Sequence, residues 1–360
     1  MRPQRWGMQM SFSLNRRQLL LGSAALGSFA VMGAGSGVFS PRVVAAAGQL
    51  VTTTYGGPYE LFWRETLAPP FEKATGTNVL VDVGNGVKWA ADLRASGPEK
   101  PAYSYVMMNE LVGALLRQEG FFKKWPTEKV PNLAKVHPKA IVAGGMGVTA
   151  MVSPIGIAYR TDMVSAPKKS WKEFWENSEL KGKIGLYDIT DTGGYMFIMM
   201  ISQIYGSSAL DFDKGFAQLQ KLVPFPTSDP ATLLSRGEIA ACPLDIRETL
   251  DMQKKGVPVA FVVPEEGMFM YDQTFDLLRA APNEDAACAF LDYILSDEIQ
   301  LKLAEEFLCI PVNTHTVLPA ELAKSLILTA NDLDKIVTFD WIGASKVRDK
   351  VAERWNRTVR

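Results

Sequence analysis

The stretch Gln49–Val83 places a helix between two strands, and this order limits the chain to few folds. The first strand, Gln49–Tyr55, is rich in Thr and ends at a Gly-Gly-Pro turn. A helix with Leu and Phe at helical spacing follows, and Thr75-Gly76 ends it before the second strand, Thr77–Val83. Strands joined through a helix pair in parallel. The sequence therefore predicts an α/β fold with parallel strands.

Three predicted strands end along one edge of this sheet. The first two end at Thr54-Tyr55 and Val83-Gly84, and a third strand, Tyr103–Met108, ends at Met108-Asn109. In open α/β sheets, ligands bind beyond the carboxyl ends of the strands. We therefore expect this edge to face a ligand.

The chain then leaves the first unit and returns to it. Residues 121–150 are rich in Lys, Pro and Gly and predict a crossing to a second α/β unit, which begins with the strand Ser153–Tyr159. The stretch Val259–Phe275 returns through a buried strand and a Pro-Glu-Glu-Gly turn, and it places Asp272 among aromatic and Met side chains. This stretch also fits an ordinary core strand, turn and strand. Two crossings predict a hinge on which two lobes close over a ligand.

The first 47 residues have the three parts of a bacterial export signal. Arg16-Arg17 precedes an apolar stretch that is rich in Gly and Ala and reaches Phe39, and Ala45-Ala46-Ala47 forms a cleavage site. We predict a twin-arginine signal at 1–47 that is removed on export. The alternative is an uncleaved membrane anchor, because the run from Leu19 to Phe39 is long enough to span a bilayer.

Composition excludes some classes of protein. The chain has 360 residues, of which 47% are hydrophobic and 21% are charged, so it has ordinary globular composition and the length for two packed units. The formal charge of −1 includes five Arg and no acidic residue within 1–47, so the remainder is mildly acidic. Without Lys/Arg tracts it is not expected to bind nucleic acid. The cysteines Cys242, Cys288 and Cys309 are expected to be free and buried, with a Cys288–Cys309 bridge as the alternative.

Several segments resemble one protein family, and they follow the family's order along the chain. They are FEKATGTNV, YSYVMMNELVGALLRQEGFFKKW, VSPIGIAYRTDMV, VVPEEGMFMYDQTFDLL, DAACAFLDYILSDEIQLKLAEEF, IPVNT and RWNR. With them the chain resembles the extracellular solute-binding proteins of ABC transporters, and most of all the spermidine/putrescine-binding type.

The resemblance implies a periplasmic-binding-protein type II fold, in which two α/β lobes are joined by a two-crossing hinge. The predicted parts are a cleaved signal at 1–47, lobe 1 at 48–153 and 263–315, and lobe 2 at 154–262. C-terminal helices at 316–360 are expected to pack on lobe 1. It also implies a periplasmic monomer that is not an enzyme, needs no cofactor and hands a small solute to a permease in the inner membrane.

Polyamine binders hold amines with carboxylates and sandwich the methylene chain between aromatic rings. The family's Glu-Gly-x-aromatic-x-Asp region matches this chain so that Asp272 is the candidate amine contact and Tyr271 or Phe269 an aromatic wall. The resemblance implies further ligand contacts from the strand ends of both lobes: Tyr55, Tyr59, Asn109, Asp191, Tyr195 and Asp245. Two departures weaken the match to spermidine, namely Gly193-Gly194 in place of a second acid and Cys242-Pro243-Leu244 where Trp is frequent.

The same region also fits an anionic ligand. Gly193 and Gly194 at a helix start expose backbone N–H groups, and Arg247 offers a bidentate partner for a carboxylate, phosphonate or sulfate. A ligand with both amine and acid ends, such as an amino acid or aminophosphonate, satisfies both sets. Alternatively, Asp191 is only a helix N-cap and Arg247 only a solvated helix charge.

Other readings stay open. A ferric site needs several convergent oxygen donors, but the sequence has no adjacent Tyr-Tyr pair, and its histidines, His137 and His315, lie beside a proline and in a C-terminal loop. No metal ligands are therefore assigned and ferric iron is a minor alternative, whereas a thiamine-like ligand fits the aromatic and acidic residues. The usual nucleotide, acyl-transfer and zinc motifs are missing, so an exported α/β enzyme, with Asp191, Asp245 or Asp272 as acid and base, is a minor alternative.

Overall fold

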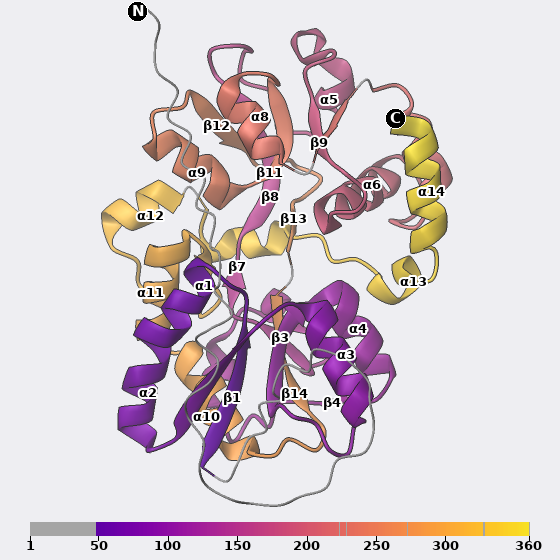
Figure 1. Ribbon diagram of the computed structural model, residues 1–360. Helices are drawn as coiled ribbons and strands as arrows, with labels where there is room; N and C mark the ends of the chain where they lie inside the picture. Colours follow the sequence, from indigo (N-terminus) through magenta and orange to yellow (C-terminus); the bar gives the residue numbers. More distant parts are fainter. Residues whose placement is uncertain (1–47, 223, 228, 272, 327, 360) are drawn as a thin grey trace, which may run out of the picture. The chain divides into compact units, whose positions relative to one another are not determined.

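The structure is a computed structural model that describes residues 48–222, 224–227, 229–271, 273–326 and 328–359 (Figure 1). The predicted export signal at 1–47 and the candidate contact Asp272 lie outside the described residues. Within the described ranges, no helix has both the length and the apolar character that crossing a membrane requires.

The predicted strand–helix–strand unit is present at the start of the described chain. Strand β1 (Gln49–Thr54) pairs in parallel with β2 (Asn78–Val83), so that Thr54 lies opposite Val83. The connection is one continuous helical segment made of α1 (Pro58–Leu61), a π-helical stretch η1 (Phe62–Leu67) and α2 (Ala68–Thr75). It ends at Gly76, whose φ of 71° is the left-handed conformation that favours glycine. The prediction of a parallel β-α-β unit is confirmed.

The first large sheet is built around β14 (Gln273–Leu278), which comes late in the sequence. β14 pairs antiparallel with β3 (Tyr105–Asn109), β6 (Gly147–Thr149) and β4 (Phe122–Lys123), and β5 (Ile141–Val142) extends the sheet beyond β6. β3 also lies beside β1, because the Met107 amide donates to Thr53 Oγ1 at 2.7 Å. Parallel pairing is thus confined to β1 and β2 in this part of the described chain.

A second sheet is built around β8 (Pro154–Arg160), whose seven residues are all buried. β11 (Ala241–Asp245), β12 (Val259–Val262) and β13 (Phe269–Met270) all pair with β8 in the antiparallel direction. Beside it, β9 (Gly185–Tyr187) pairs in parallel with β10 (Phe225–Thr227).

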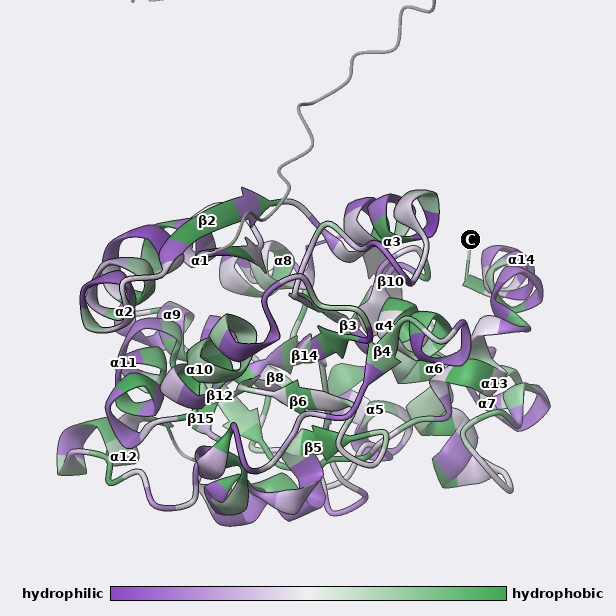
Figure 2. Cartoon of the chain, turned by 90° about the horizontal axis from the view of Figure 1, so that it is seen from below, coloured by the Kyte–Doolittle hydropathy of each residue, from purple (hydrophilic) through white to green (hydrophobic). Residues whose placement is uncertain are grey.

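Helices cover both sheets (Figure 1). α3 and α4 contact β3, and α10 contacts β1 and β14; α8 and α9 contact the second sheet, and α6 contacts β9. The outer helices, such as α2, α7 and α12, carry many hydrophilic residues, whereas the strands between the helices are mostly hydrophobic (Figure 2).

The bounds of these and the remaining helices are α3 (Gly86–Ser96), α4 (Glu110–Gln118), α5 (Glu173–Glu176), α6 (Thr192–Tyr205), α7 (Phe212–Leu219), α8 (Pro230–Arg236), α9 (Ile246–Lys254), α10 (Glu284–Ile294), α11 (Asp297–Phe307), α12 (Ala320–Leu326), α13 (Trp341–Ser345) and α14 (Arg348–Val359), with 3₁₀ turns η2 (Pro131–Lys135), η3 (Pro138–Ala140), η4 (Ser178–Leu180) and η5 (Ala330–Lys335).

The chain passes between the two sheets at two places. The first passage runs from β7 (Met151–Val152), which pairs with β15 (Ile310–Pro311), through Ser153 into β8. The second runs from β13, on the second sheet, through Tyr271 to β14 on the first. Both lie close to the crossings expected from the sequence, although the return comes several residues after Val262. Whether they act as a hinge stays a prediction.

Two aromatic rings of the second passage are buried in different cores. Phe269 stacks on Trp171 at a centroid distance of 5.5 Å, in the core around α6. Phe275 stacks on Trp63 at 6.5 Å, in the core around β14 and α10. Burying a Phe side chain contributes about 1.5–3 kcal/mol, so each sheet holds one end of the passage firmly.

The C-terminal segment was expected to pack on lobe 1, and only its first part does. Leu326 and Ile336 belong to the first core, but Trp341 and Trp355 belong to the second. α14 contacts α7, and the Arg354 guanidinium lies 4.6 Å from the ring centre of Phe216. The apolar face of α14, which includes Val351 and Trp355, therefore packs on the second lobe.

A buried ion-pair network joins α4 to β14. Arg117 binds Glu110 through two nitrogens, at 2.6 and 2.8 Å, and donates from Nε to Asp276 Oδ1 at 2.8 Å. The side chains of Arg117 and Asp276 are 7% and 0% exposed. Thr274 donates its hydroxyl proton to the second oxygen of Asp276. All the charges in this network are satisfied within the chain.

Candidate functional site

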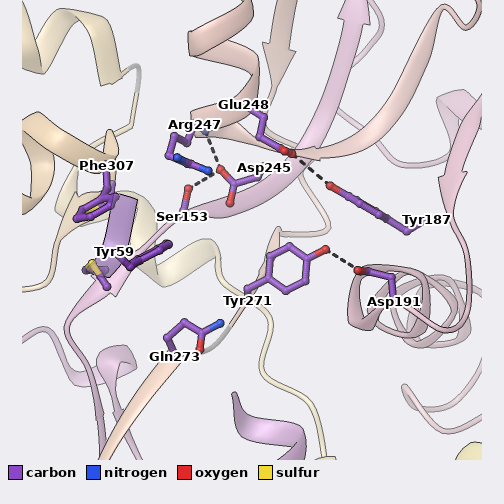
Figure 3. Close-up of a pocket in the computed structure, with 12 residues that line it drawn as sticks. Tyr59, Ser153, Tyr187, Asp191, Asp245, Arg247, Glu248, Tyr271, Gln273 and Phe307 are labelled. Carbon is purple, nitrogen blue, oxygen red and sulfur yellow. Dashed lines mark hydrogen bonds between the residues drawn. The ribbon is translucent and has the colours of Figure 1, made fainter. Parts of the chain in front are cut away.

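A pocket lies where the ends of strands and helices from both sheets meet, and it has a volume of about 320 Å³ (Figure 3). Its lining combines acidic, aromatic and a few other side chains: Tyr59, Met151, Ser153, Tyr187, Asp191, Asp245, Arg247, Glu248, Tyr271, Gln273, Phe307 and Cys309. This is the size and the mixed polarity of a small-molecule site.

The second passage between the sheets contributes Tyr271 and Gln273. The Tyr271 hydroxyl donates to Asp191 Oδ1 at 2.8 Å, which joins the passage to the start of α6. Gln273 is the first residue of β14, and its Oε1 accepts a hydrogen bond from the Tyr55 hydroxyl at 2.6 Å. Both side chains are thereby fixed in orientation.

Asp245, at the end of β11, is also the N-cap of α9. Its Oδ1 accepts hydrogen bonds from the Ser153 hydroxyl at 2.5 Å and from the backbone amide of Arg247 at 2.7 Å. Burial raises the pKa of Asp245 to about 7, and these hydrogen bonds only partly oppose the shift. The carboxylate therefore lies in a place where a bound cation would stabilise it.

Glu248 lies in the first turn of α9 and completes the acidic lining. The Tyr187 hydroxyl donates to Glu248 Oε2 at 3.3 Å. Burial raises the pKa of Glu248, and burial also raises the pKa of the phenols of Tyr187 and Tyr271, which keeps both hydroxyls protonated as donors. Three carboxyl groups, on Asp191, Asp245 and Glu248, thus line one small pocket.

Arg247 is the cation of this lining. It is partly buried, and in the part of the chain that the structure describes its guanidinium has no recorded hydrogen bond or ion pair. Its charge acts only through space, and it lowers the pKa of Asp245 against the larger effect of burial. The guanidinium therefore offers its donors to the pocket.

Two aromatic pairs contribute to the lining of the site (Figure 3). Tyr59 stacks on Phe307 with centroids 4.6 Å apart and an angle of 13° between the rings. Tyr187 and Tyr271 meet edge to face at 6.4 Å. Ring faces attract cations and cover methylene groups, so both pairs suit an amine on an apolar stem.

The structure brings together five of the side chains singled out in the sequence: Tyr59, Asp191, Asp245, Arg247 and Tyr271. Tyr55 lies just behind the lining and contacts it through Gln273. Asn109 is the N-cap of α4 and accepts a hydrogen bond from the Val112 amide at 3.2 Å, so its side chain serves the helix. Asp191 is both an N-cap of α6 and a pocket residue.

Tyr195 and Phe269 lie in the protein core and not at the pocket. Tyr195 is fully buried, donates its hydroxyl proton to the carbonyl of Ala344 at 2.6 Å and stacks on Phe212. It lies one turn into α6, on the side of that helix which faces the C-terminal segment. Phe269 belongs to β13, where its ring faces Trp171.

Gly193 and Gly194 allow close packing, and the amide of Gly193 is bonded within the chain. The Gly193 amide donates to Asp191 Oδ1 at 2.6 Å, and a Cβ at Gly193 would lie 2.6 Å from the Tyr271 hydroxyl. A Cβ at Gly194 would lie 2.4 Å from the carbonyl oxygen of Asp188. The first glycine therefore makes room for the Tyr271–Asp191 contact, and the second for the approach of α6 to the preceding strand.

Seven lining residues were missed from the sequence: Met151, Ser153, Tyr187, Glu248, Gln273, Phe307 and Cys309. Tyr187 and Glu248 carried a usable pattern, because Tyr187 ends a strand and Glu248 lies one turn past the strand end at Asp245. Phe307 and Cys309 come from α11 and the residues after it, which only tertiary packing brings to the site. All three cysteines are free and buried, as the sequence favoured.

Residues 66–330 match the family of bacterial extracellular solute-binding proteins. The chain belongs to this family. It is the substrate-binding component of an ABC transporter, with the mixed α/β fold of periplasmic solute-binding proteins. The family and the relatives found are binding proteins and not enzymes, in agreement with the sequence prediction.

Relatives of known binding function are distant. A spermidine/putrescine-binding periplasmic protein from Haemophilus influenzae is 23% identical, over 72% of this chain and 75% of its own length. A γ-aminobutyric acid-binding protein from Pseudomonas aeruginosa is also 23% identical, over 80% of this chain and 84% of its own. The crystal structure of an ABC transporter from Clostridium perfringens has 26% identity and a TM-score of 0.75, and the match covers 86% of this chain and all of that one.

Among the described residues, no group of three or more His, Cys, Asp or Glu side chains is arranged to hold a metal ion.

Proposed function

We propose that this protein is exported to the periplasm, binds a small amine-containing solute in the pocket and delivers it to a permease in the inner membrane. The observation that carries the proposal is the convergence of Asp191, Asp245 and Glu248 between two aromatic pairs. An ammonium group suits this lining because it donates to carboxylates and lies favourably against ring faces.

The acidic lining is incomplete without a cation. Asp245 has its pKa raised by burial, and the burial of Glu248 acts in the same direction. Contact with a bound ammonium would favour the ionised form of these carboxyl groups. Part of the binding free energy then comes from giving each buried carboxylate a partner of opposite charge. A neutral sugar or an inorganic anion would not provide this.

The relatives support an amine-containing solute as a class, and they do not single out one compound. Their names give spermidine and putrescine for one protein and γ-aminobutyric acid for another, and these solutes share a primary or secondary amine on a methylene chain. A polyamine is the solute expected from the sequence. Thiamine, which has aromatic rings and a positive charge, is the competitor that the same lining accommodates.

Delivery would follow from closure of the two lobes. A ligand that contacts Asp191 from the second lobe and Tyr59 from the first favours the conformation in which both contacts are made. Only that conformation is proposed to dock productively on the permease. Small-angle scattering with and without bound solute tests closure, and equal radii of gyration in the two states would contradict it.

The first experiment is thermal stabilisation of the purified protein by putrescine, spermidine, γ-aminobutyrate, thiamine, glutarate, sulfate and ferric citrate. A ligand present at about 100 times its Kd stabilises the folded protein by about 2.7 kcal/mol, which is readily measured. We expect stabilisation by at least one of the first three. Stabilisation by glutarate, sulfate or ferric citrate and by none of the amines would refute the proposal.

A further inference from the structure

We infer that the solute carries an anionic end as well as its amine. Arg247 and Gln273 bind this end as donors, while Asp191, Asp245 and Glu248 bind the ammonium. This inference rests on the proposed function, since it adds a second end to the same solute. It defines the class as a short zwitterion in which methylene groups separate ammonium from carboxylate, and it disfavours a diamine.

The first observation is the state of Arg247. Arg117 and Arg160, whose side chains are largely buried, form ion pairs within the described ranges, with carboxylate oxygens at 2.6–2.9 Å. The Arg247 guanidinium lines the pocket without any recorded partner in those ranges. A guanidinium has five N–H donors and no acceptor, and it pairs best with a carboxylate through two parallel hydrogen bonds. Neither amine of a diamine can accept these bonds.

The second observation is the orientation of Gln273. Its Oε1 is held by the hydroxyl of Tyr55 at 2.6 Å, which fixes the amide so that Nε2 is the end left to donate. Gln273 lines the pocket, and the described part of the chain offers Nε2 no recorded acceptor. The pocket thus has a second donor that only a ligand acceptor would satisfy.

The third observation is that Asp191 lies apart from the two donors, whereas Asp245 lies next to Arg247 (Figure 3). Arg247 and Gln273 lie on one side of Tyr271, and Asp191 lies on the other, where Tyr271 donates to it. Glu248 is tied to the ring pair of this second side through the Tyr187 hydroxyl. A short ligand that spans Tyr271 meets the donors of Arg247 and Gln273 at one end and the carboxyl group of Asp191 at the other.

A diamine would place its second ammonium near Arg247, where like charges repel and no acceptor balances them apart from Asp245. Asp245 already accepts hydrogen bonds from Ser153 and from the Arg247 amide. The ω-amino acid avoids this repulsion and satisfies the donors of Arg247 and Gln273 at the same time.

The test compares four probes of matched length by titration calorimetry: γ-aminobutyrate, putrescine, n-butylamine and glutarate. We expect γ-aminobutyrate to bind at least 10-fold more tightly than putrescine and n-butylamine. Arg247→Met should lower the affinity for γ-aminobutyrate at least 10-fold and leave the affinity for n-butylamine unchanged. The affinity of Arg247→Lys for γ-aminobutyrate should lie between those of the wild type and Arg247→Met. Arg236→Met, which removes a largely exposed arginine outside the pocket lining, is the matched control and should change neither.

The outcomes separate this inference from the proposed function. If putrescine binds as tightly as γ-aminobutyrate, or if Arg247→Met leaves the affinity for γ-aminobutyrate intact, the zwitterion inference fails while the amine proposal stands. If glutarate binds and the three amines do not, both fail. The comparison of probes on the unmodified protein decides the matter even if Arg247→Met does not fold.

Discussion

Arg117 and Arg247 each have two acidic residues in their surroundings, but only Arg117 is bonded to them. Arg117 binds Glu110 and Asp276 with distances of 2.6–2.8 Å, and its side chain is 7% exposed. Arg247 has Asp245 and Glu248 near it, yet it forms no ion pair in the described chain. The first set of charges is complete when the protein folds. The second set remains incomplete, which is the property of a binding site.

The acids of the two sets differ in the same way. Asp276 accepts from Arg117 through one oxygen and from the Thr274 hydroxyl through the other. Asp245 accepts both of its recorded hydrogen bonds on Oδ1 alone. A bound ammonium would supply the missing charge and a donor for Oδ2.

The largest expected effect is on the free energy of unfolding. Equal effects for the two arginines would contradict the contrast between a folded-state ion pair and a binding site. Arg117→Met leaves Glu110 and Asp276 buried without their cation, so we expect a loss of about 3–5 kcal/mol in the free energy of unfolding. Arg247→Met removes no ion pair and should change it by less than about 1 kcal/mol. Urea denaturation of the unliganded variants measures both values. Equal losses would show that Arg247 has a structural partner.

The next effect sharpens the role of Asp245. Asp245→Asn preserves the shape and the N-cap but removes the charge, so amine affinity should fall about 10–100-fold, the effect of losing one charged hydrogen bond. At pH 8 the unliganded variant should be at least as stable as the wild type, because the isolated buried charge is gone. Calorimetry and thermal unfolding give the two readouts. A variant that loses stability and keeps its affinity would make Asp245 a structural residue like Asp276.

A third prediction concerns pH. The folded pKa of Asp245 is about 7, above its ordinary value of 3.8, so the folded state holds the proton more tightly than the unfolded state. The contribution to stability is full below pH 4, and it is lost as pH rises toward and through 7. Amine binding requires the ionised form and should therefore weaken about 30-fold from pH 8 to pH 5.5, with Glu248 acting in the same direction.

Calorimetric titrations at pH 5.5, 7 and 8 measure this dependence, and Asp245→Asn should flatten it. Affinity that stays constant over this range in the wild type would contradict the assignment of the amine to these carboxyl groups.

The smallest effect separates two tyrosines. Tyr195→Phe removes the buried hydrogen bond to the Ala344 carbonyl and should lower the free energy of unfolding by about 1 kcal/mol with no change in affinity. Tyr271→Phe, its matched variant in the pocket, should weaken amine binding several-fold because Asp191 loses its tyrosine donor. Thermal unfolding and calorimetry on both variants provide the measurements. A change in affinity in the Tyr195 variant would return that residue to the site.

The sequence predicted the parts of the fold that local patterns control. Strand β1, its helical connection and β2 follow from alternating apolar residues and a Gly stop, and the two passages follow from the order of the units. The antiparallel sheet around β14 was not predicted, because its strands pair across more than 100 residues of sequence and leave no local pattern.

The site was predicted where acids follow strands and missed where packing decides. Asp191 and Asp245 are N-caps of helices that follow strands, and such strand-to-helix junctions are visible in a sequence. The family resemblance named Tyr195 as a ligand contact, but its place one helical turn after Asp191 directs its side chain into the core. Phe307 reaches Tyr59 only because α11 packs against the first helical segment.

The passage from β13 to β14 has a consequence for how such a protein diversifies. Tyr271 and Gln273 line the pocket, and the same stretch joins the two sheets covalently. Substitutions there alter solute choice and the link between the lobes together, so selection acts on both at once. Arg247 and Glu248, on the first turn of α9, can vary without touching that link. In a lineage that acquires a new solute, these two positions are where change should accumulate first.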